Sequence, residues 1–306
     1  MNIYFINPPF KAEYGKFSRE SRSPAITKSG ALYYPLWLIY AALYSSKQGH
    51  NVSFLDAPAK QLNEEQSLNI IRKTDNEHSL FVLDTSTPSI KNDVAFAGKL
   101  KAIYPHSFVV LVGTHPSACA EETLGYSNAV DAVAIGEYDC IVNELANVLD
   151  AGKDLREVRG LCFWDGKEFV RTAHMPPMKN LDDLPFASQF IKEHLNERDY
   201  FFAAATYPSI QIFTGRGCPF RCNFCVYPQT MHGHAFRARS AAISSCGKKA
   251  SPTRRSAASV TTSTPITSST SWTMAWTRKC GSAATTSRQV SGSCSALPAP
   301  SSTSPA

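Results

Sequence analysis

The stretch FVVLVGTHP at residues 108–116 shows the unit from which the first half of this chain is built. Its apolar residues, Phe108–Val112, predict a strand, and the residues GTHP that follow predict a loop. The same order of a short apolar strand, a loop and then a helical pattern recurs along residues 1–150. Such alternation is typical of an α/β fold.

Five strands and four helices are predicted in residues 1–150. The predicted strands are Asn2–Ile6, Val52–Leu55, Leu80–Leu83, Phe108–Val112 and Ala132–Ile135, and the predicted helices are Pro35–Lys47, Glu64–Lys73, Ser89–Tyr104 and Asp139–Leu149. Because strands that each lead into a helix run parallel, we predict an α/β domain with a flavodoxin-like, doubly wound parallel sheet and helices on both faces.

Ligands on such sheets bind beside the carboxyl ends of the strands, so the loops after the strands form the candidate binding site. These loops carry hydroxyl groups and glycines, which let a ligand approach the backbone. The candidate residues are Asn7, Pro8, Thr85, Ser86, Thr87, Gly113, Thr114, His115, Gly136 and Glu137. Two simpler roles stay open: hydroxyls at 85–87 can satisfy strand-end backbone groups, and Glu137 can cap the next helix.

Residues 151–200 predict a hairpin and an extended connector. The Asp-Gly pair at 165–166 lies between the predicted strands Leu161–Trp164 and Glu168–Arg171, and this pair is a strong signal for a tight turn.

Residues 201–240 contain a predicted strand, Ser209–Thr214, that leads directly into Cys218, Cys222 and Cys225. Cysteines so closely spaced, in a chain whose other cysteines are sparse, indicate metal ligation rather than a disulfide framework. Three thiolates on one loop can bind three irons of a [4Fe–4S] cluster and leave the fourth iron open to another ligand.

This cysteine spacing resembles the radical S-adenosylmethionine (SAM) family. Phe224 before the third cysteine, Gly215, Gly217 and the preceding strand all fit the family pattern. The resemblance implies a [4Fe–4S] cluster held by the three cysteines and SAM bound to its open iron. It also implies the start of a partial (β/α)6 barrel in residues 201–240, a small-molecule substrate and an electron donor such as flavodoxin or ferredoxin.

The segment Tyr227–Ser240 resembles cobalamin-dependent members of that family, such as hopanoid-pathway proteins and the anaerobic magnesium-protoporphyrin ester cyclase. This resemblance implies that residues 1–150 bind cobalamin and that the chemistry is methyl transfer, radical rearrangement or cyclisation. The loop at residues 7–10, NPPF, lacks the Asp-x-His-x-x-Gly signature of classical cobalamin domains, so water or an open position is expected below cobalt. Arg237 and Arg239 are expected either at a solvated strand edge or beside an anionic group.

Charge is unevenly distributed along the chain. The net charge is +6, but residues 241–306 hold seven Lys or Arg and no acidic residue, which leaves 24 basic and 25 acidic residues in the first 240. That balance gives no indication of nucleic-acid binding. The sequence has no secretory signal, and its longest near-apolar run, Tyr33–Tyr44, is about half the ~20 residues of a membrane span. We therefore expect a cytoplasmic protein without a transmembrane segment.

The composition changes abruptly after Ser240. Of the 66 residues at 241–306, 28 are Ser or Thr, and hydrophobic periodicity disappears. Such a segment buries too little apolar surface to offset its ordering entropy, which predicts a disordered tail. Its composition is also typical of a GC-rich coding region translated in the wrong frame, so we interpret it as a frameshifted tail. Without the family's Gly-Gly-Glu type segment after Ser240, the chain is expected to be inactive.

Two alternative functions stay open at this point. The first is a non-catalytic cobalamin-binding module whose cluster loop is vestigial. The second is a zinc-binding protein in which His232 or His234 completes a site with the three thiolates. A chance cluster of buried cysteines fits less well, because the loop sequence CPFRC at 218–222 is polar.

The frameshift makes a prediction about the coding DNA. Translation of the region after the Ser240 codon in its other two frames is expected to give an ordinary α/β pattern with acidic residues. If neither frame gives such a pattern, the tail is native sequence and the frameshift hypothesis is wrong.

Overall fold

The computed structural model describes residues 1–240 except 12, 14, 20–23, 28 and 75–77. The predicted disordered tail at 241–306 lies outside the described residues, so its disorder stays a prediction.

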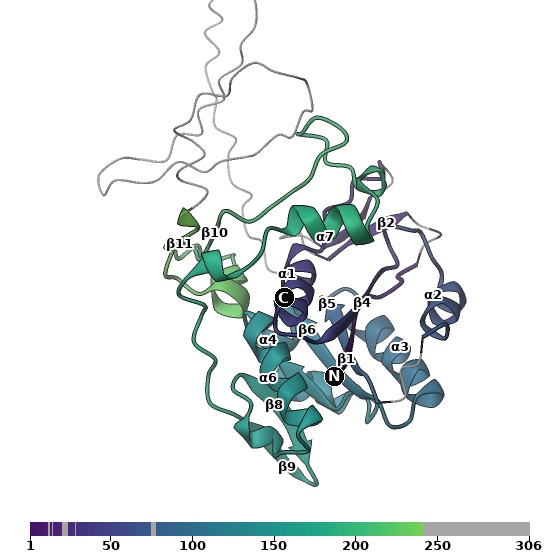
Figure 1. The fold of residues 1–306 in the computed structure, drawn as a ribbon, viewed down its shortest axis with the longest axis vertical. Coiled ribbons are helices and arrows are strands. Elements are labelled where there is room, and N and C mark those ends of the chain that lie inside the picture. Colours follow the sequence, from purple (N-terminus) through teal and green to yellow (C-terminus); the bar gives the residue numbers. More distant parts are fainter. Residues whose placement is uncertain (12, 14, 20–23, 28, 75–77, 241–306) are drawn as a thin grey trace, which may run out of the picture. The chain divides into compact units, whose positions relative to one another are not determined.

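A seven-stranded sheet in the order β4-β1-β5-β6-β7-β8-β9 forms the centre of the described fold (Figure 1). The first five strands of that order are parallel, and β8 and β9 are antiparallel to their neighbours. The parallel part has the strand order of flavodoxin-like folds. Successive strands are added on one side of β1 first and then on the other, so the strand order reverses between β1 and β5. The predicted doubly wound parallel sheet is therefore confirmed. The strands are β1 Asn2–Asn7, β4 Asn51–Asp56, β5 Leu80–Thr85, β6 Phe108–Gly113, β7 Ala132–Ala134, β8 Leu161–Asp165 and β9 Glu168–Arg171.

Helices cover both faces of this sheet because its strands are apolar on both sides. Leu80 and Val82 of β5 belong to one buried core, together with helices α1, α6 and α7. Phe81 and Leu83 belong to a second core with α2, α3 and α5. The helices are α1 Leu36–Lys47, α2 Glu64–Ile71, α3 Ile90–Ile103, α4 Thr114–Ala118, α5 Ala120–Gly125, α6 Tyr138–Asp150 and α7 Ala187–His194, with short turns η2 Leu155–Glu157, η3 Leu181–Asp183 and η4 Glu197–Asp199 and a π-helix η5 Pro228–His232.

The predicted hairpin at 161–171 extends the sheet rather than standing apart from it. Strand β8 pairs with β7, because Leu161, Cys162 and Phe163 are buried against the sheet's two cores. A second hairpin, β2 Lys16–Ser18 with β3 Ala25–Thr27, was not predicted, since its short strands lack an apolar run.

The predicted strand Ser209–Thr214 is wrong. These residues form no strand, and pairing begins only at β10, Gly215–Arg216, which lies antiparallel to β11, Arg237–Ala238. The physical reason is that a strand needs a hydrogen-bonding neighbour, and no strand runs beside residues 209–214 among the residues that the structure describes.

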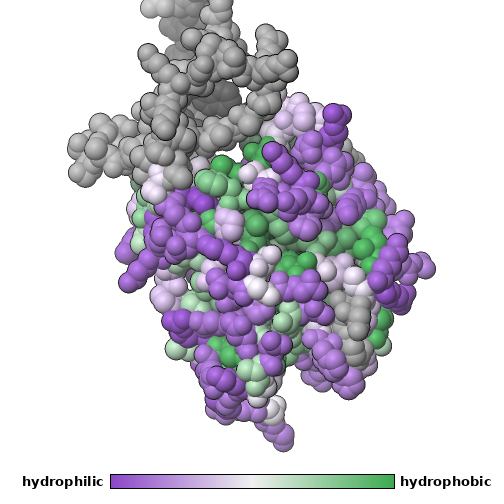
Figure 2. All heavy atoms as spheres, in the orientation of Figure 1, coloured by the Kyte–Doolittle hydropathy of each residue, from purple (hydrophilic) through white to green (hydrophobic). Residues whose placement is uncertain are grey.

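No described helix is long and apolar enough to cross a membrane. Figure 2 shows hydrophilic side chains over much of the face in view, with hydrophobic ones between them.

The end of β6 depends on a glycine. Gly113 has φ +114°, and a Cβ added there would lie 2.3 Å from the carbonyl oxygen of Thr85. We expect Gly113→Ala to lower the free energy of unfolding by about 1–3 kcal/mol. The control is Gly98→Ala in α3, where an added Cβ meets no atom within 4 Å. This variant is expected to raise the free energy of unfolding by about 0.5–1 kcal/mol. Urea unfolding of both variants tests this, and equal effects would contradict it.

Candidate functional site

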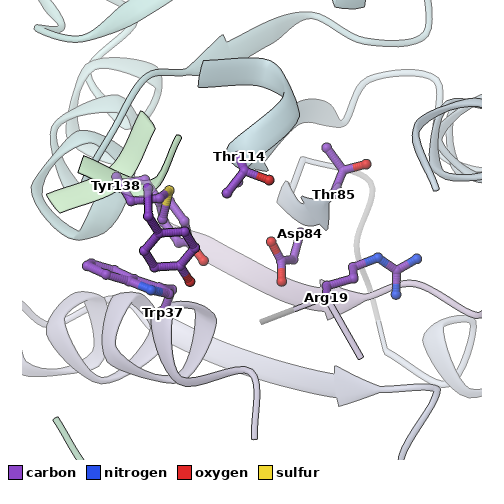
Figure 3. Close-up of a pocket in the computed structure, with 9 residues that line it drawn as sticks. Arg19, Trp37, Asp84, Thr85, Thr114 and Tyr138 are labelled. Atoms are coloured by element: carbon purple, nitrogen blue, oxygen red, sulfur yellow. The ribbon is translucent and has the colours of Figure 1, made fainter. Parts of the chain in front are cut away.

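A small pocket lies at the edge of the sheet where the parallel strands end (Figure 3). Its residues come from the ends of β5 and β6, from the starts of α1, α4 and α6, and from the segment around η5. This edge, beside the change of direction between β1 and β5, is where sheets of this class bind ligands. The segment after β2 adds Arg19, and the full lining is Arg19, Trp37, Asp84, Thr85, Gly113, Thr114, Tyr138, Tyr227 and Met231.

Asp84 brings a carboxyl group into this pocket. Along β5, side chains alternate between the two faces, so Asp84 lies on the same side as Leu80 and Val82, toward α1 and α6. The residue is only 5% exposed. A Cβ at Gly113 would lie 2.9 Å from its Oδ1 atom, so that glycine also leaves room for the carboxyl group.

The charge of Asp84 is poorly compensated. Burial raises the pKa of Asp84 to about 7; Arg19 opposes this effect, while Asp93 and Asp56 add to it. The guanidinium of Arg19 is turned away from Asp84 and forms an ion pair with Asp93 at 2.6 Å (Figure 3). Among the described residues Asp84 thus has no ion-pair partner, and its carboxyl is largely protonated below neutral pH.

Arg19 holds several of the predicted binding residues in a buried polar network. Its Nη1 donates to Oδ1 of Asn7 at 2.7 Å and to the carbonyl oxygen of Pro8 at 2.8 Å. The hydroxyl of Thr85 donates to the carboxylate of Asp93 at 2.5 Å. Asn7, Pro8 and Thr85 therefore already have partners within the protein, and they fix the shape of the strand-end edge.

His115 lies beside the loop that follows β5. Its Nδ1 is 3.2 Å from the hydroxyl oxygen of Thr87, while Nε2 is buried and has no hydrogen-bond partner within the described part of the chain. Burial lowers the pKa of His115, so its ring is neutral at pH 7. In the same loop, the backbone N–H of Ser86 donates to the hydroxyl of Ser89. Beside this loop, Nε2 of His115 is thus a buried polar atom that finds no partner among the described residues.

A second buried network joins the cysteine segment to the sheet. Arg216 donates to Asp139 at 2.6 Å and lies 3.5 Å from the carboxylate of Glu137. Its guanidinium also lies over the ring of Trp37, 4.3 Å from the centroid. Burial lowers the pKa of Arg216, but the two carboxylates outweigh it and the net pKa is raised, so the group is charged. Glu137 also pairs with Arg237.

The predicted solvated strand edge at Arg237 and Arg239 is wrong. Nη1 of Arg237 donates to Glu137 at 3.0 Å and to the carbonyl oxygen of Met178 at 2.8 Å. Arg239 is 4% exposed and donates to the carbonyl oxygens of Leu184 and Pro185. Arg239 is buried and Arg237 is half-buried because both find acceptors on the connector and at the strand ends, which the local sequence does not show. Gly136, the other predicted residue here, donates its N–H to Ser117 at 3.0 Å.

The three cysteines lie on one loop that is fixed at its start. The N–H of Cys218 donates to the carbonyl oxygen of Gly233, and a Cβ at Gly217 would lie 1.9 Å from the carbonyl oxygen of Ala235. Cys222 is exposed, Cys218 and Cys225 are half-buried, and all three are free thiols.

In the described residues, no three His, Cys, Asp or Glu side chains converge to hold a metal ion. The donor set of three free thiols on one loop suits an iron–sulfur cluster, in which each thiol binds a different iron. Neither histidine of the zinc alternative joins the three thiols in such a group. His232 stacks with Trp37 and Tyr227, and Nδ1 of His234 lies near the carbonyl oxygen of Cys218. Phe224 is 87% exposed.

The chemistry of the pocket suits cobalamin better than its size does. The hydroxyl of Thr114 and the orphaned nitrogen of His115 match the polar amides at a corrin's edge, and Trp37 adds an apolar residue to the lining. The enclosed space of about 10 Å³ has room for about one water molecule and is nevertheless far below the about 300–1,000 Å³ of typical ligand pockets. A corrin therefore needs the segment around η5 to move outward.

Sequence analysis missed two central residues of this site. Asp84 had a signal, since it is a charged residue at the end of an otherwise apolar run directly before the chosen Thr85. Arg19 had none, because it lies in a polar stretch far from the strand-end loops that it joins.

The Arg216 network makes a prediction about stability. Arg216→Met leaves Asp139 and Glu137 buried with too little positive charge, so we expect the free energy of unfolding to fall by about 3–5 kcal/mol. The control is Arg156→Met, which removes an exposed ion pair with Asp165 and is expected to change it by less than about 1 kcal/mol. Urea unfolding measures both, and a loss at Arg216 no larger than at Arg156 would contradict the role given to this network.

Comparison with known proteins supports the interpretation of this edge. Residues 22–146 match the family model of the B12 binding domain. An uncharacterized methyltransferase of Pyrococcus horikoshii is 31% identical over 192 residues, which cover 62% of this chain and 40% of that protein. The anaerobic magnesium-protoporphyrin IX monomethyl ester cyclase of Cereibacter sphaeroides is 25% identical over 195 residues, which cover 62% of this chain and 31% of the cyclase.

A solved structure, that of the cobalamin-dependent S-adenosylmethionine radical enzyme OxsB with aqua-cobalamin and S-adenosylmethionine bound, has a similar fold. Its TM-score is 0.57 at 16% identity, over 78% of this chain and 30% of that one. The chain thus spans less than half the length of these relatives. As its sequence predicts, residues 22–146 match a B12-binding type of domain, and the chain is similar to these proteins in sequence and, to the cobalamin-dependent radical SAM enzyme, in fold.

Proposed function

We propose that the strand-end edge binds cobalamin. The observation that supports this most directly is that the B12-binding match at 22–146 includes the loops after β5, β6 and β7, where the pocket lies. Thr85, Gly113 and Thr114 line that pocket, and His115 offers an unpartnered buried nitrogen beside it. Asn7, Pro8 and Ser86 would hold the edge in shape, and Thr87, Gly136 and Glu137 would border the cofactor.

We further propose that Cys218, Cys222 and Cys225 bind a [4Fe–4S] cluster, with Phe224 and SAM beside it. Three free thiols in this spacing on one accessible loop support the proposal. When bound, such a cluster would supply the electron that cleaves SAM. A donor such as flavodoxin or ferredoxin would provide that electron to the cluster. The protein's own contribution is to fix the loop at Cys218 and, through Arg216, to hold its base against the cobalamin edge.

The reaction class that fits these cofactors is methyl transfer, rearrangement or cyclisation on a small molecule. We propose that this chain does not complete it, because residues 241–306 hold no acidic residue and none of the family's SAM-binding segments. A non-catalytic cobalamin-binding module is the second candidate, and the observation that favours it is that the B12-binding match covers residues 22–146, which lie before the three cysteines.

Anaerobic reconstitution with iron, sulfide and hydroxocobalamin tests the two cofactor sites separately. We expect retained corrin absorption together with the broad visible absorption and the iron and sulfide content of a cluster. Cys222→Ser is expected to lose the cluster and keep the corrin, whereas the control Cys119→Ser, a half-buried thiol outside the loop, keeps both.

Corrin without cluster in the unmodified chain would favour the binding module, and zinc without corrin would contradict the proposal. Incubation with SAM and dithionite is expected to give no 5′-deoxyadenosine, and its formation would show that the chain is active.

A further inference from the structure

The carboxyl group of Asp84 has no role in the fold that explains its position. Asp84 is the last residue but one of β5, the strand between β1 and β6, and is 5% exposed in the pocket at the ligand edge. Buried carboxylates are normally paired with a cation or with several hydrogen-bond donors. In the part of the chain that the structure describes, Asp84 has no ion-pair partner; the backbone N–H of Thr85 donates to it, and Gly113 keeps space open for it.

The nearest cation is committed elsewhere. Arg19 lines the same pocket, but its guanidinium forms an ion pair with Asp93 and donates to Asn7 and Pro8. Figure 3 shows Asp84 between the side chains of Tyr138 and Arg19, with Thr85 and Thr114 beside it.

The surroundings of Asp84 are therefore negative and low in dielectric. Asp93 on α3 and Asp56 at the end of β4 both add negative charge, and the other titratable groups in the pocket are the phenols of Tyr138 and Tyr227. A buried acid in such a site stays protonated until a positive charge arrives.

We propose that Asp84 faces bound cobalamin and compensates the positive charge of its cobalt centre, giving up its proton to solvent when the cofactor binds. This inference rests on the proposed cobalamin site and adds a residue and a charge requirement to it. Aquacobalamin carries a net positive charge, whereas cyanocobalamin is neutral. Asp84 is thus a positioning residue that favours the cationic form of the cofactor.

The sign of the pH effect follows from linkage. In the empty protein the pKa of Asp84 is raised to about 7, and a cation beside it lowers that pKa. Binding of aquacobalamin at pH 6 therefore releases roughly one proton, and the affinity rises about fivefold from pH 6 to pH 7 before levelling off. Cyanocobalamin brings no net charge, so its binding should release few protons and vary little with pH.

Calorimetric titration of the full chain tests this, with aquacobalamin and cyanocobalamin in buffers of different ionisation enthalpy at pH 6 and pH 7. We expect proton release with aquacobalamin only. Asp84→Asn is expected to abolish that release, to bind aquacobalamin about fivefold or more weakly at pH 7, and to keep its affinity for cyanocobalamin. The control Asp131→Asn removes a carboxyl that pairs with Lys101 before the start of β7, at the opposite edge of the sheet, and should behave like the unmodified chain.

The outcomes separate the two proposals. If the unmodified chain binds neither cobalamin, the proposed function fails and this inference fails with it. If the unmodified chain binds both forms with equal proton release, the ionisation of Asp84 does not respond to the charge of the cofactor. The inference alone is then overturned, whatever the variant does. Proton release that persists in Asp84→Asn would assign it to another group and overturn the inference as well.

Discussion

The buried guanidinium of Arg216 joins the base of the cysteine loop to the sheet. Its side chain is 1% exposed, it pairs with Asp139 and Glu137 at the start of α6, and it stacks on Trp37 of α1. With Arg237, which also pairs with Glu137, the cluster contains two cations and two anions and is neutral as a whole. Buried charges are tolerated only when compensated in this way. The base of the cysteine loop therefore lies against the sheet through charge neutrality rather than through apolar area alone.

This attachment decides what happens at the ligand edge. Because the chain returns from the cysteine loop through η5 to Arg237, Tyr227 and Met231 lie over the pocket at the ends of β5 and β6. The pocket is consequently small, although its position and polar groups suit a large planar cofactor. The pocket opens only if η5 moves. Arg216 before the cysteine loop and Arg237 after η5 stay fixed to the sheet during that movement. Cofactor binding and the position of the cysteine loop are thereby coupled through one short stretch of chain.

The ligand edge contains two kinds of buried acid. Asp93 and Asp56 are satisfied by Arg19, Thr85, Asn7 and Tyr200, and they stabilise the arrangement of the loops. Asp84 lacks such partners among the described residues, and burial raises its pKa, as it also raises the pKa of Asp56. Three aspartates at the same edge thus differ in role: Asp56 and Asp93 hold the structure, and Asp84 remains available to a ligand.

The order of strands and helices in residues 1–150 follows from the sequence, because apolar runs and helical spacing are local patterns that persist in the fold. The sequence also places Thr85, Gly113, Thr114 and His115 at the strand ends, and it identifies the three cysteines by spacing alone. Only the tertiary structure decides which of these groups are free. Arg19, distant in sequence, binds Asn7 and Pro8, and Arg216 and Arg237 bind Glu137. It also decides that residues 209–214 form no strand, since a strand depends on a neighbour. Pairing between distant residues, which sets burial and charge, cannot be inferred from local patterns.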